Sequence, residues 1–211
     1  METKIMKAST EAIEYAIQLL KQGAAVIFPS DNIYGMVANA EDPEAVKEIY
    51  ALKGRDEGKP LGFMTNRNHA TRWGSFSIDA SRALEFWPCG LTIIVPKYAS
   101  VPDYITKGFN SILLSCPDET CAELAAQAEF PLACTSANLS GELAVSSCDQ
   151  AMAVFDGKVP LIIDGGESSR KSAGTIIDFS RTPPTVLRIG AFPLENLRRA
   201  VPSLIVASRL I

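Results

Sequence analysis

The sequence predicts one α/β domain over residues 1–211. Segments with helical periodicity alternate with short β-branched runs along most of the chain, which is the pattern of helices packed on a sheet. The chain has no internal repeat and no low-complexity linker that would divide it, and 211 residues are enough for one sizeable core. The apolar fraction of 47% and the charged fraction of 21% are ordinary for a globular protein.

The first third of the chain shows the alternation clearly. Apolar residues recur at i, i+3, i+4 and i+7 within 10–22, which predicts an amphipathic helix, and AAVIF at 24–28 follows as a short buried strand. Asp42 and Pro43 are a favourable N-cap and first residue for a second helix. Gly54 is a favourable stop for that helix.

The remaining elements continue the alternation. Strands are predicted at 61–65, 91–95, 111–115, 131–135, 161–163, 175–179 and 186–189. Helices are predicted at 79–87, from Asp118 onward, at 147–155 and at 193–200. The Gly- and Ser-rich segment 165–174 is expected to be a mobile surface loop.

Composition disfavours several classes of protein. No run of eighteen apolar residues is present, so no membrane-spanning helix is expected, and the N-terminal residues lack the apolar core of a secretory signal. Five cysteines without CxxC spacing favour free, buried thiols in a reducing cytoplasm over a zinc site or a disulfide framework. The single histidine, His69, lies in a polar run, which disfavours catalytic triads and imidazole metal sites.

Charge is distributed unevenly along the chain. The net charge of −4 and the pI near 5.1 are unlike those of a dedicated nucleic-acid-binding protein. Residues 53–72 nevertheless carry five Lys and Arg residues against two Asp and Glu residues. A local basic patch of this kind suits a ligand that bears phosphate groups.

Four polar or charged segments follow predicted strands and helices or interrupt an apolar strand pattern. They are PSDNIYG (29–35), KGRDEGKPL (53–61), TSANLSG (135–141) and VLRIG (186–190). The two common phosphate-binding signatures, GxxxxGK[ST] and GxGxxG, are absent. Loops at strand ends of an α/β sheet are where ligands bind, so these segments are the candidates for a site.

The residue types in these segments suit a polyphosphate. Arg55 and Lys59 offer guanidinium and ammonium groups, Ser136 and Asn138 offer hydroxyl and amide groups, and Arg188 could close on the same anion. Each segment also has a purely structural explanation. A cation at the end of a helix complements the helix dipole, and Ser and Asn are common turn residues.

Taken together, and with WPCGLT (87–92), SCP (115–117) and GTIID (174–178), these segments resemble the YrdC-like domain of threonylcarbamoyl-adenylate synthases. The resemblance covers a core of about 10–192 and leaves a C-terminal helix and tail at 193–211. It implies a single-domain twisted open mixed sheet with flanking helices and a concave, positively charged cavity. Because the sequence ends at residue 211, the extra C-terminal domain of longer family members is expected to be absent.

The resemblance implies a reaction as well. ATP, bicarbonate and L-threonine would give threonylcarbamoyl-AMP and pyrophosphate, with Mg²⁺ accompanying ATP and with no covalent enzyme intermediate. Partner proteins of the threonylcarbamoyl-transferase machinery would then modify adenosine 37 of tRNA. No catalytic side chain and no protein metal site are expected, because positioning and charge neutralisation at the α-phosphate would carry the reaction.

Carried over position by position, the family's nucleotide contacts are mostly retained. Neutralisation of charge falls to Lys53, Arg55 and Lys59. The full set of predicted ATP-binding residues is Arg55, Lys59, Ser111, Ser136, Asn138 and Arg188. Ser111 stands where the family usually has threonine, so a hydroxyl is kept.

The amino-acid side departs from the family pattern. The predicted threonine and bicarbonate side consists of Ser30, Asn32, Met64, Ser115, Cys134 and Gly174. At four of these positions the family usually has another residue: threonine at 32, histidine at 64, arginine at 115 and serine at 174. Loss of the arginine matters most, because a hydroxyl does not replace a bidentate ion pair with a carboxylate.

Two alternatives follow. The first is a divergent YciO-like paralogue that binds a nucleotide, RNA or both without activity toward threonine, which the four altered positions favour. The second is a non-enzymatic module for double-stranded RNA or tRNA, which the basic residues 53–72 favour and the low pI disfavours.

Overall fold

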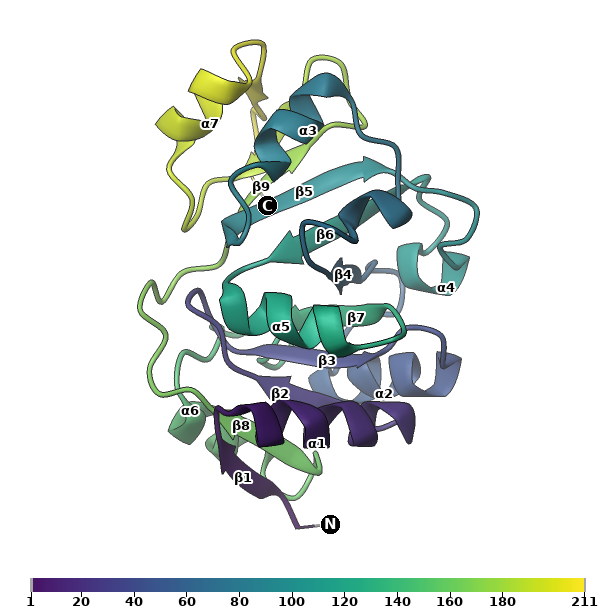
Figure 1. The fold of residues 1–211 in the computed structure, drawn as a ribbon, viewed down its shortest axis with the longest axis vertical. Helices are drawn as coiled ribbons and strands as arrows, with labels where there is room; N and C mark the ends of the chain where they lie inside the picture. Colours follow the sequence, from purple (N-terminus) through teal and green to yellow (C-terminus); the bar gives the residue numbers. More distant parts are fainter. Residues whose placement is uncertain (1, 211) are drawn as a thin grey trace.

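The computed structural model describes residues 2–210 as one mixed sheet with helices on both faces (Figure 1). In sheet order the described strands are β1 (Lys4–Lys7), β8 (Leu161–Asp164), β2 (Val26–Phe28), β3 (Gly35–Asn39), β7 (Leu132–Ser136), β4 (Gly62–Met64), β6 (Ser111–Cys116), β5 (Cys89–Pro96), β9 (Thr175–Asp178), β10 (Thr185–Arg188) and β11 (Ile205–Val206). The described helices are α1 (Thr10–Lys21), α2 (Pro43–Lys53), α3 (Ile78–Leu84), α4 (Asp103–Thr106), α5 (Glu119–Gln127), α6 (Cys148–Phe155) and α7 (Leu194–Ala200), with a 3-10 turn η1 (Ala70–Arg72).

The sheet is open. Its described part runs from β1 at one edge to β11 at the other, so it does not close into a barrel. Parallel pairs such as β1–β8 and β5–β9 occur beside antiparallel pairs such as β3–β7 and β5–β6. Strand directions turn progressively across the sheet in Figure 1, as expected for a twisted sheet. The predicted twisted, open, mixed α/β sheet in a single domain is confirmed.

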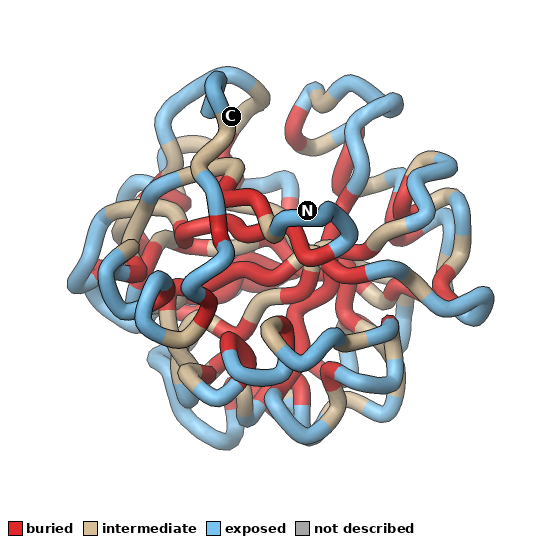
Figure 2. Tube along the Cα trace, turned by 90° about the horizontal axis from the view of Figure 1, so that it is seen from above, coloured by how far each residue is buried: buried red, intermediate tan, exposed pale blue. Residues whose placement is uncertain are grey.

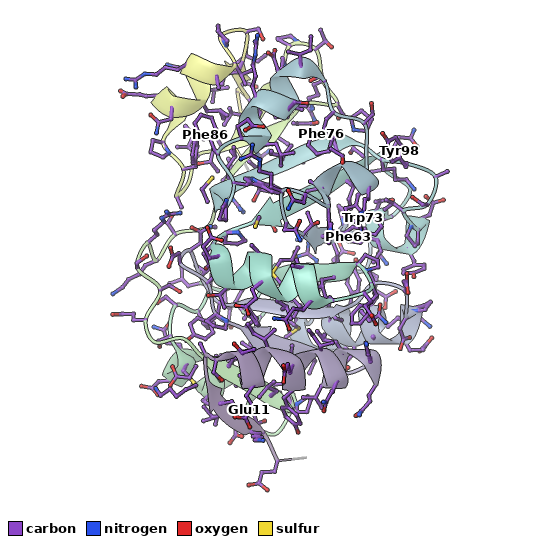
Figure 3. All side chains as sticks on the ribbon, in the orientation of Figure 1. Glu11, Phe63, Trp73, Phe76, Phe86 and Tyr98 are labelled. Carbon is purple, nitrogen blue, oxygen red and sulfur yellow. The ribbon has the colours of Figure 1, made fainter. Side chains whose placement is uncertain are left out.

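Two apolar clusters fill the two faces of the sheet. Leu20 of α1 and Leu124 of α5 pack with Phe28 on one face, where both helices cross in front of the sheet in Figure 1. The larger cluster contains residues of α2, α3 and α6 on the other face. It includes an edge-to-face pair between Phe63 and Trp73, which lie side by side in Figure 3 with ring centroids 5.2 Å apart. Figure 2 shows the buried segments gathered through the centre of the molecule.

The helix ends are fixed by the local signals in the sequence. The Asp42 carboxylate accepts hydrogen bonds from the backbone N–H groups of the first turn of α2, at 2.9 Å from Glu44. Gly54 ends the same helix in a left-handed conformation with φ of 55°. Asp118 caps α5 through the N–H of Cys121 at 2.9 Å.

The structure also contains elements that the sequence patterns do not predict. β1 and β11 lie at the two edges, where strands need no alternation of buried and exposed residues. β3 is mostly buried and lies between β2 and β7, and α4 has only four residues. The predicted strand at 24–28 starts two residues later, and the predicted helix at 79–87 ends at Leu84.

Two observations concern thiols and membranes. All five cysteines are free, and Cys116, Cys121 and Cys148 are buried. Within residues 2–210, no helix combines the length and the apolar character that crossing a bilayer demands.

Candidate functional site

One face of the sheet carries a row of polar side chains across several strands. Arg188 on β10 lies opposite Ile176 on β9, which lies opposite Thr92 on β5. Thr92 in turn lies opposite Ser115 on β6, and Ser115 lies opposite Met64 on β4. Because residues opposite one another in a ladder point to the same side, these side chains share one face. We call it the polar face.

A second group of predicted residues lies on the same face. Ser111 and Ser115 are four residues apart on β6, and both are half-buried while Ile112 and Leu114 between them are buried. The Ser115 hydroxyl lies 3.7 Å from the Sγ of Cys134 on β7.

Cys134 lies opposite Gly62, and Ser136 follows two residues later on the same side of β7. The polar face therefore brings together Ser111, Ser115, Cys134, Ser136 and Arg188.

Lys53 holds the segment after β7 in place. Its Nζ donates to the carbonyl oxygens of Ser136 and Asn138, the latter at 2.7 Å, and to Asn138 Oδ1 at 3.3 Å. The side chain is only 2% exposed, so burial, with a smaller contribution from the charge of Arg55, lowers the pKa of Lys53 to about 8. The Ser136 hydroxyl also donates to Asn138 Oδ1 at 2.5 Å. Lys53 thus fixes the conformation of residues 136–138 through hydrogen bonds, and its ammonium group is buried.

Arg55 and Lys59 lie on the turn that joins α2 to β4. The Arg55 Nη2 donates to the carbonyl of Pro60 at 3.0 Å, and its buried Nε has no hydrogen-bond partner among the described residues. Lys59 is exposed, and its carbonyl accepts a hydrogen bond from the Tyr50 hydroxyl at 2.8 Å. A buried guanidinium nitrogen without a partner is costly, and this one is enclosed by the protein, so only the remaining N–H groups of Arg55 can face a ligand.

The turn carrying these cations is attached directly to the segment after β7. The N–H of Ser140 donates to the carbonyl of Lys53 at 2.8 Å. Arg55, Lys59, Ser136 and Asn138 therefore belong to one local assembly at the end of β7.

Arg188 lies at the other side of the polar face. Its Nε donates to the carbonyl of Gly174 at 2.9 Å, and burial lowers the pKa of its guanidinium. No carboxylate pairs with it among residues 2–210. The guanidinium therefore keeps its charge available for an anion.

Gly174 allows two strands to approach closely. A Cβ at this position would lie 3.0 Å from the carbonyl oxygen of Gly90 and 3.2 Å from the Thr92 hydroxyl. The glycine thus fits a tight contact between the starts of β5 and β9, and it contributes no side chain to the site.

Asn32 closes the end of the polar face near the start of β5. Its side chain is 5% exposed, and its Oδ1 would lie 2.8 Å from a Cβ on Gly90. The Ser30 hydroxyl donates to the carbonyl of Ile33 at 2.6 Å and shapes the turn that carries Asn32. Ser30 thus supports the turn, and Asn32 reaches across to β5.

The predicted mobile loop 165–174 is tied to this turn. The N–H groups of Arg170 and Ser172 donate to the carbonyls of Asp31 and Asn32 at 2.9 and 3.1 Å. The Ser168 hydroxyl donates to the carbonyl of Ser30 at 2.7 Å. In Figure 1 the segment runs along the left edge of the sheet from β8 to β9. The segment is a surface loop, as predicted, and these hydrogen bonds tie it to residues 30–32.

The predicted site residues thus form two groups that share the polar face. Gly174 and Arg188 lie near Asn32 at the start of β5, and Ser136 lies with the cations of the α2–β4 turn at the end of β7. Residues 32–35 join the groups, because Gly35 lies opposite Ser136 while Asn32 reaches β5. Met64 is 6% exposed and packs in the cluster under α1 and α5, so its side chain belongs to the core.

Three residues at the site are missing from the sequence prediction. Gly90 and Thr92 lie within the WPCGLT segment, which contributes to the family resemblance but was not predicted to line the site. Arg170 lies on the loop expected to be mobile. The charge of Arg170 in an otherwise small and polar segment is the one signal that could have marked it.

The surroundings of the polar face are acidic on one side and hold no cluster of metal-ligating residues. A cleft of about 320 Å³ beside residues 29–31 is lined in part by Asp31, Asp118, Glu119 and Glu167. Among residues 2–210, no group of three or more His, Cys, Asp or Glu side chains gathers in a way that could hold a metal ion.

A protein-family model matches most of the chain. A family model named Sua5_yciO_yrdC, with the description "Telomere recombination", matches residues 18–190. The chain belongs to the Sua5/YciO/YrdC family. The family resemblance of the polar segments is therefore confirmed.

Individual relatives agree with this family assignment. A threonylcarbamoyl-AMP synthase of Pyrococcus abyssi is 34% identical over 198 residues, which is 90% of this chain and 57% of that protein. The crystal structure of P. abyssi Sua5 complexed with L-threonine superposes with a TM-score of 0.90 at 32% identity, over 97% of this chain and 63% of that one. The chain therefore spans somewhat more than half the length of these two relatives.

The YciO branch of the family shares the fold. The crystal structure of Escherichia coli YciO matches with a TM-score of 0.83 and 20% identity, covering 92% of this chain and 99% of that one. At this identity the likeness concerns the fold alone.

Proposed function

We propose that this domain makes threonylcarbamoyl-AMP and pyrophosphate from ATP, bicarbonate and L-threonine. The observation that carries the proposal is that Ser136 and Arg188 share one face of the sheet, while Lys53 links the turn carrying Arg55 and Lys59 to the segment after β7. Hydroxyl and cationic groups fixed in this way suit a phosphate group. The family membership and the threonylcarbamoyl-AMP synthase among its relatives support the same reaction.

In this proposal the triphosphate lies on the polar face. Arg55 and Lys59 neutralise its charge, the Ser111 and Ser136 hydroxyls bind its oxygens, and Arg188 approaches from β10. The predicted contact from the Asn138 side chain is not available, because its amide donates to the carbonyls of Leu139 and Glu142. Mg²⁺ would arrive with ATP, held by phosphate oxygens and water.

The protein's contribution to the chemistry is positioning. The threonine amine and bicarbonate combine to a carbamate with loss of water, and a carbamate oxygen must then approach the α-phosphorus in line while pyrophosphate departs. Fixed cations lower the barrier because negative charge is spread over phosphate oxygens in the transition state. No side chain forms a covalent bond to the substrate in this scheme.

The product would be consumed by partner proteins that transfer the threonylcarbamoyl group to adenosine 37 of tRNA. Free thiols throughout the chain suit a reducing compartment such as the cytoplasm, where this modification would take place. Direct binding of double-stranded RNA would have to use the exposed basic residues near Lys59.

A second candidate is a nucleotide-binding paralogue without activity toward threonine. It is favoured by the residues at 32, 64, 115 and 174, of which Met64 is buried and Gly174 lacks a side chain. Binding of ATP without binding of threonine would identify this candidate.

The experiment is pyrophosphate release measured with all three substrates and with each omitted in turn. We expect release that requires ATP, bicarbonate and threonine together and that falls at least tenfold in Arg188→Gln. Arg199→Gln, an exposed arginine of α7 away from the polar face, is the matched control and should keep wild-type activity. Folded protein that releases no pyrophosphate above background would refute the proposal.

A further inference from the structure

Hydrogen bonds hold the backbone at and beside Arg170. Its N–H donates to the carbonyl of Asp31 at 2.9 Å, and the N–H of Ser172 donates to the carbonyl of Asn32 at 3.1 Å. The neighbouring Ser168 is 4% exposed and its N–H and hydroxyl are both hydrogen-bonded. The side chain of Arg170 is therefore aimed by an ordered segment, although the residue itself is exposed.

The guanidinium of Arg170 points to the closed end of the polar face. Its Nη1 lies 3.4 Å from the Oδ1 of Asn32 and 3.1 Å from the position that a Cβ on Gly90 would occupy. A contact of 3.4 Å to a neutral amide is weak, and it orients the group without neutralising it. The absence of a side chain at residue 90 leaves the space that the guanidinium uses.

The positive charge of Arg170 is not balanced by the protein. Among residues 2–210 no carboxylate forms an ion pair with it, whereas the adjacent Lys171 pairs with Glu167 at 2.6 Å. Arg181, three residues after β9, pairs with Asp178 at 2.8 Å. A guanidinium has five donors in a planar fork that matches a carboxylate, so Arg170 retains the capacity for a bidentate bond.

The surroundings of this guanidinium match the part of the site that lacks an arginine. Gly90 precedes Thr92 by two residues on β5, and Thr92 lies directly opposite Ser115, the position of the missing family arginine. Arg188 reaches the same region from the far side through its bond to the carbonyl of Gly174. Gly90 therefore approaches both the Arg170 guanidinium and Gly174, the residue that holds Arg188, and both guanidinium groups lack a counter-charge among the described residues.

We propose that Arg170 binds the carboxylate of the amino-acid substrate, so that the loop 165–174 supplies the ion pair that β6 does not. Asn32 positions the guanidinium, and Arg188 remains on the nucleotide side. This inference rests on the proposed function, and it assigns the substrate class as free α-amino acids with an unmodified carboxylate. Arg170 is then a specificity-determining residue.

Calorimetry with a matched pair of ligands tests the assignment. L-threonine carries the carboxylate and L-threoninol lacks it, and both are titrated in the presence of ATP. A charge-assisted bidentate bond is worth about 10- to 100-fold in affinity. We expect Arg170→Gln to weaken threonine binding by that factor, Arg170→Lys to restore part of it, and threoninol to bind equally weakly to wild type and Arg170→Gln.

The control variant is Lys171→Gln, which removes a positive charge from the next residue of the same loop and should leave threonine binding within twofold. ATP affinity should be unchanged in both Gln variants, and this also reports that the fold is intact. Equal threonine affinity in wild type and Arg170→Gln would overturn the proposal. So would an equal loss for threonine and threoninol, or a loss of ATP affinity that matches the loss for threonine.

The same titrations separate this inference from the proposed function. If wild type binds another L-amino acid in place of threonine and the binding depends on Arg170, the inference holds and the threonine substrate is wrong. If threonine binds and pyrophosphate is released without dependence on Arg170, the function holds and the inference falls. If wild type binds no amino acid that carries a free carboxylate, both fall.

Discussion

The buried ammonium of Lys53 gives the most demanding test of the structure, because Lys53→Met removes the charge and keeps most of the stem. The three bonds from Nζ go to the carbonyls of Ser136 and Asn138 and to Asn138 Oδ1. A charge-assisted bond of this kind contributes about 1.5–3 kcal/mol net of desolvation. Burial still outweighs these bonds in the balance that sets the pKa of Lys53, which falls from 10.5 to about 8.

Loss of the donor leaves buried carbonyl acceptors unsatisfied, and we expect Lys53→Met to lower the free energy of unfolding by about 1–3 kcal/mol. Urea denaturation at pH 7 measures this change. Lys47→Met is the matched control, because Lys47 lies on the same helix, is exposed and pairs only with Glu44. A surface pair of that kind contributes little to stability. A loss in Lys53→Met no larger than in Lys47→Met would refute the reasoning.

The same pair of proteins has a pH signature. Between pH 8 and 10.5 the unfolded chain holds the Lys53 proton while the folded protein releases it. Unfolding therefore takes up a proton, and the stability of wild type relative to Lys53→Met should rise with pH in this window by up to about 1.36 kcal/mol per unit. A difference that stays constant or falls from pH 8 to 10 would show that Lys53 is not depressed in pKa.

Three further outcomes follow from the structure. Ser9 is the N-cap of α1, and its hydroxyl accepts a hydrogen bond from the N–H of Ala12 at 3.2 Å. Urea denaturation of Ser9→Ala should show a free energy of unfolding lower by about 1 kcal/mol. Unchanged stability would contradict the role of this cap. Gly62→Ala places a methyl group 2.4 Å from a Leu113 side-chain carbon and should cost about 1–3 kcal/mol in the same assay, whereas a neutral effect would mean that β4 and β6 separate freely. Burial raises the pKa of Cys134 to about 11. Its alkylation at pH 8, followed by peptide mass spectrometry, should therefore be at least about tenfold slower than in an unfolded control. Equal rates would contradict the raised pKa of this thiol.

Local features of the fold could be predicted from the sequence because their causes are local. The N-caps at Asp42 and Asp118 and the stop at Gly54 each act within one helical turn, and the structure has all three where the sequence placed them. The edge strands β1 and β11 could not be predicted, since their pairing depends on β8 and β10 more than on their own residues.

The candidate site, like the fold, could be predicted from the sequence only in part. The polar segments were recognisable as candidates, because hydroxyl, amide and basic groups concentrate in them. Their sharing of one face depends on strand register between residues distant in sequence, such as Thr92 and Ile176. The burial of Lys53 and the contact of Arg170 with Asn32, 138 residues away in sequence, arise only when the chain folds back.

The measurement that tests the central claim most directly is the affinity of ATP for Arg55→Gln and Arg188→Gln, determined by calorimetry beside wild type and Arg199→Gln. If one nucleotide touches both guanidinium groups, each of the two site variants loses tenfold or more in affinity while Arg199→Gln binds as wild type does. Wild-type affinity in either site variant would mean that the α2–β4 turn and β10 do not serve a common ligand.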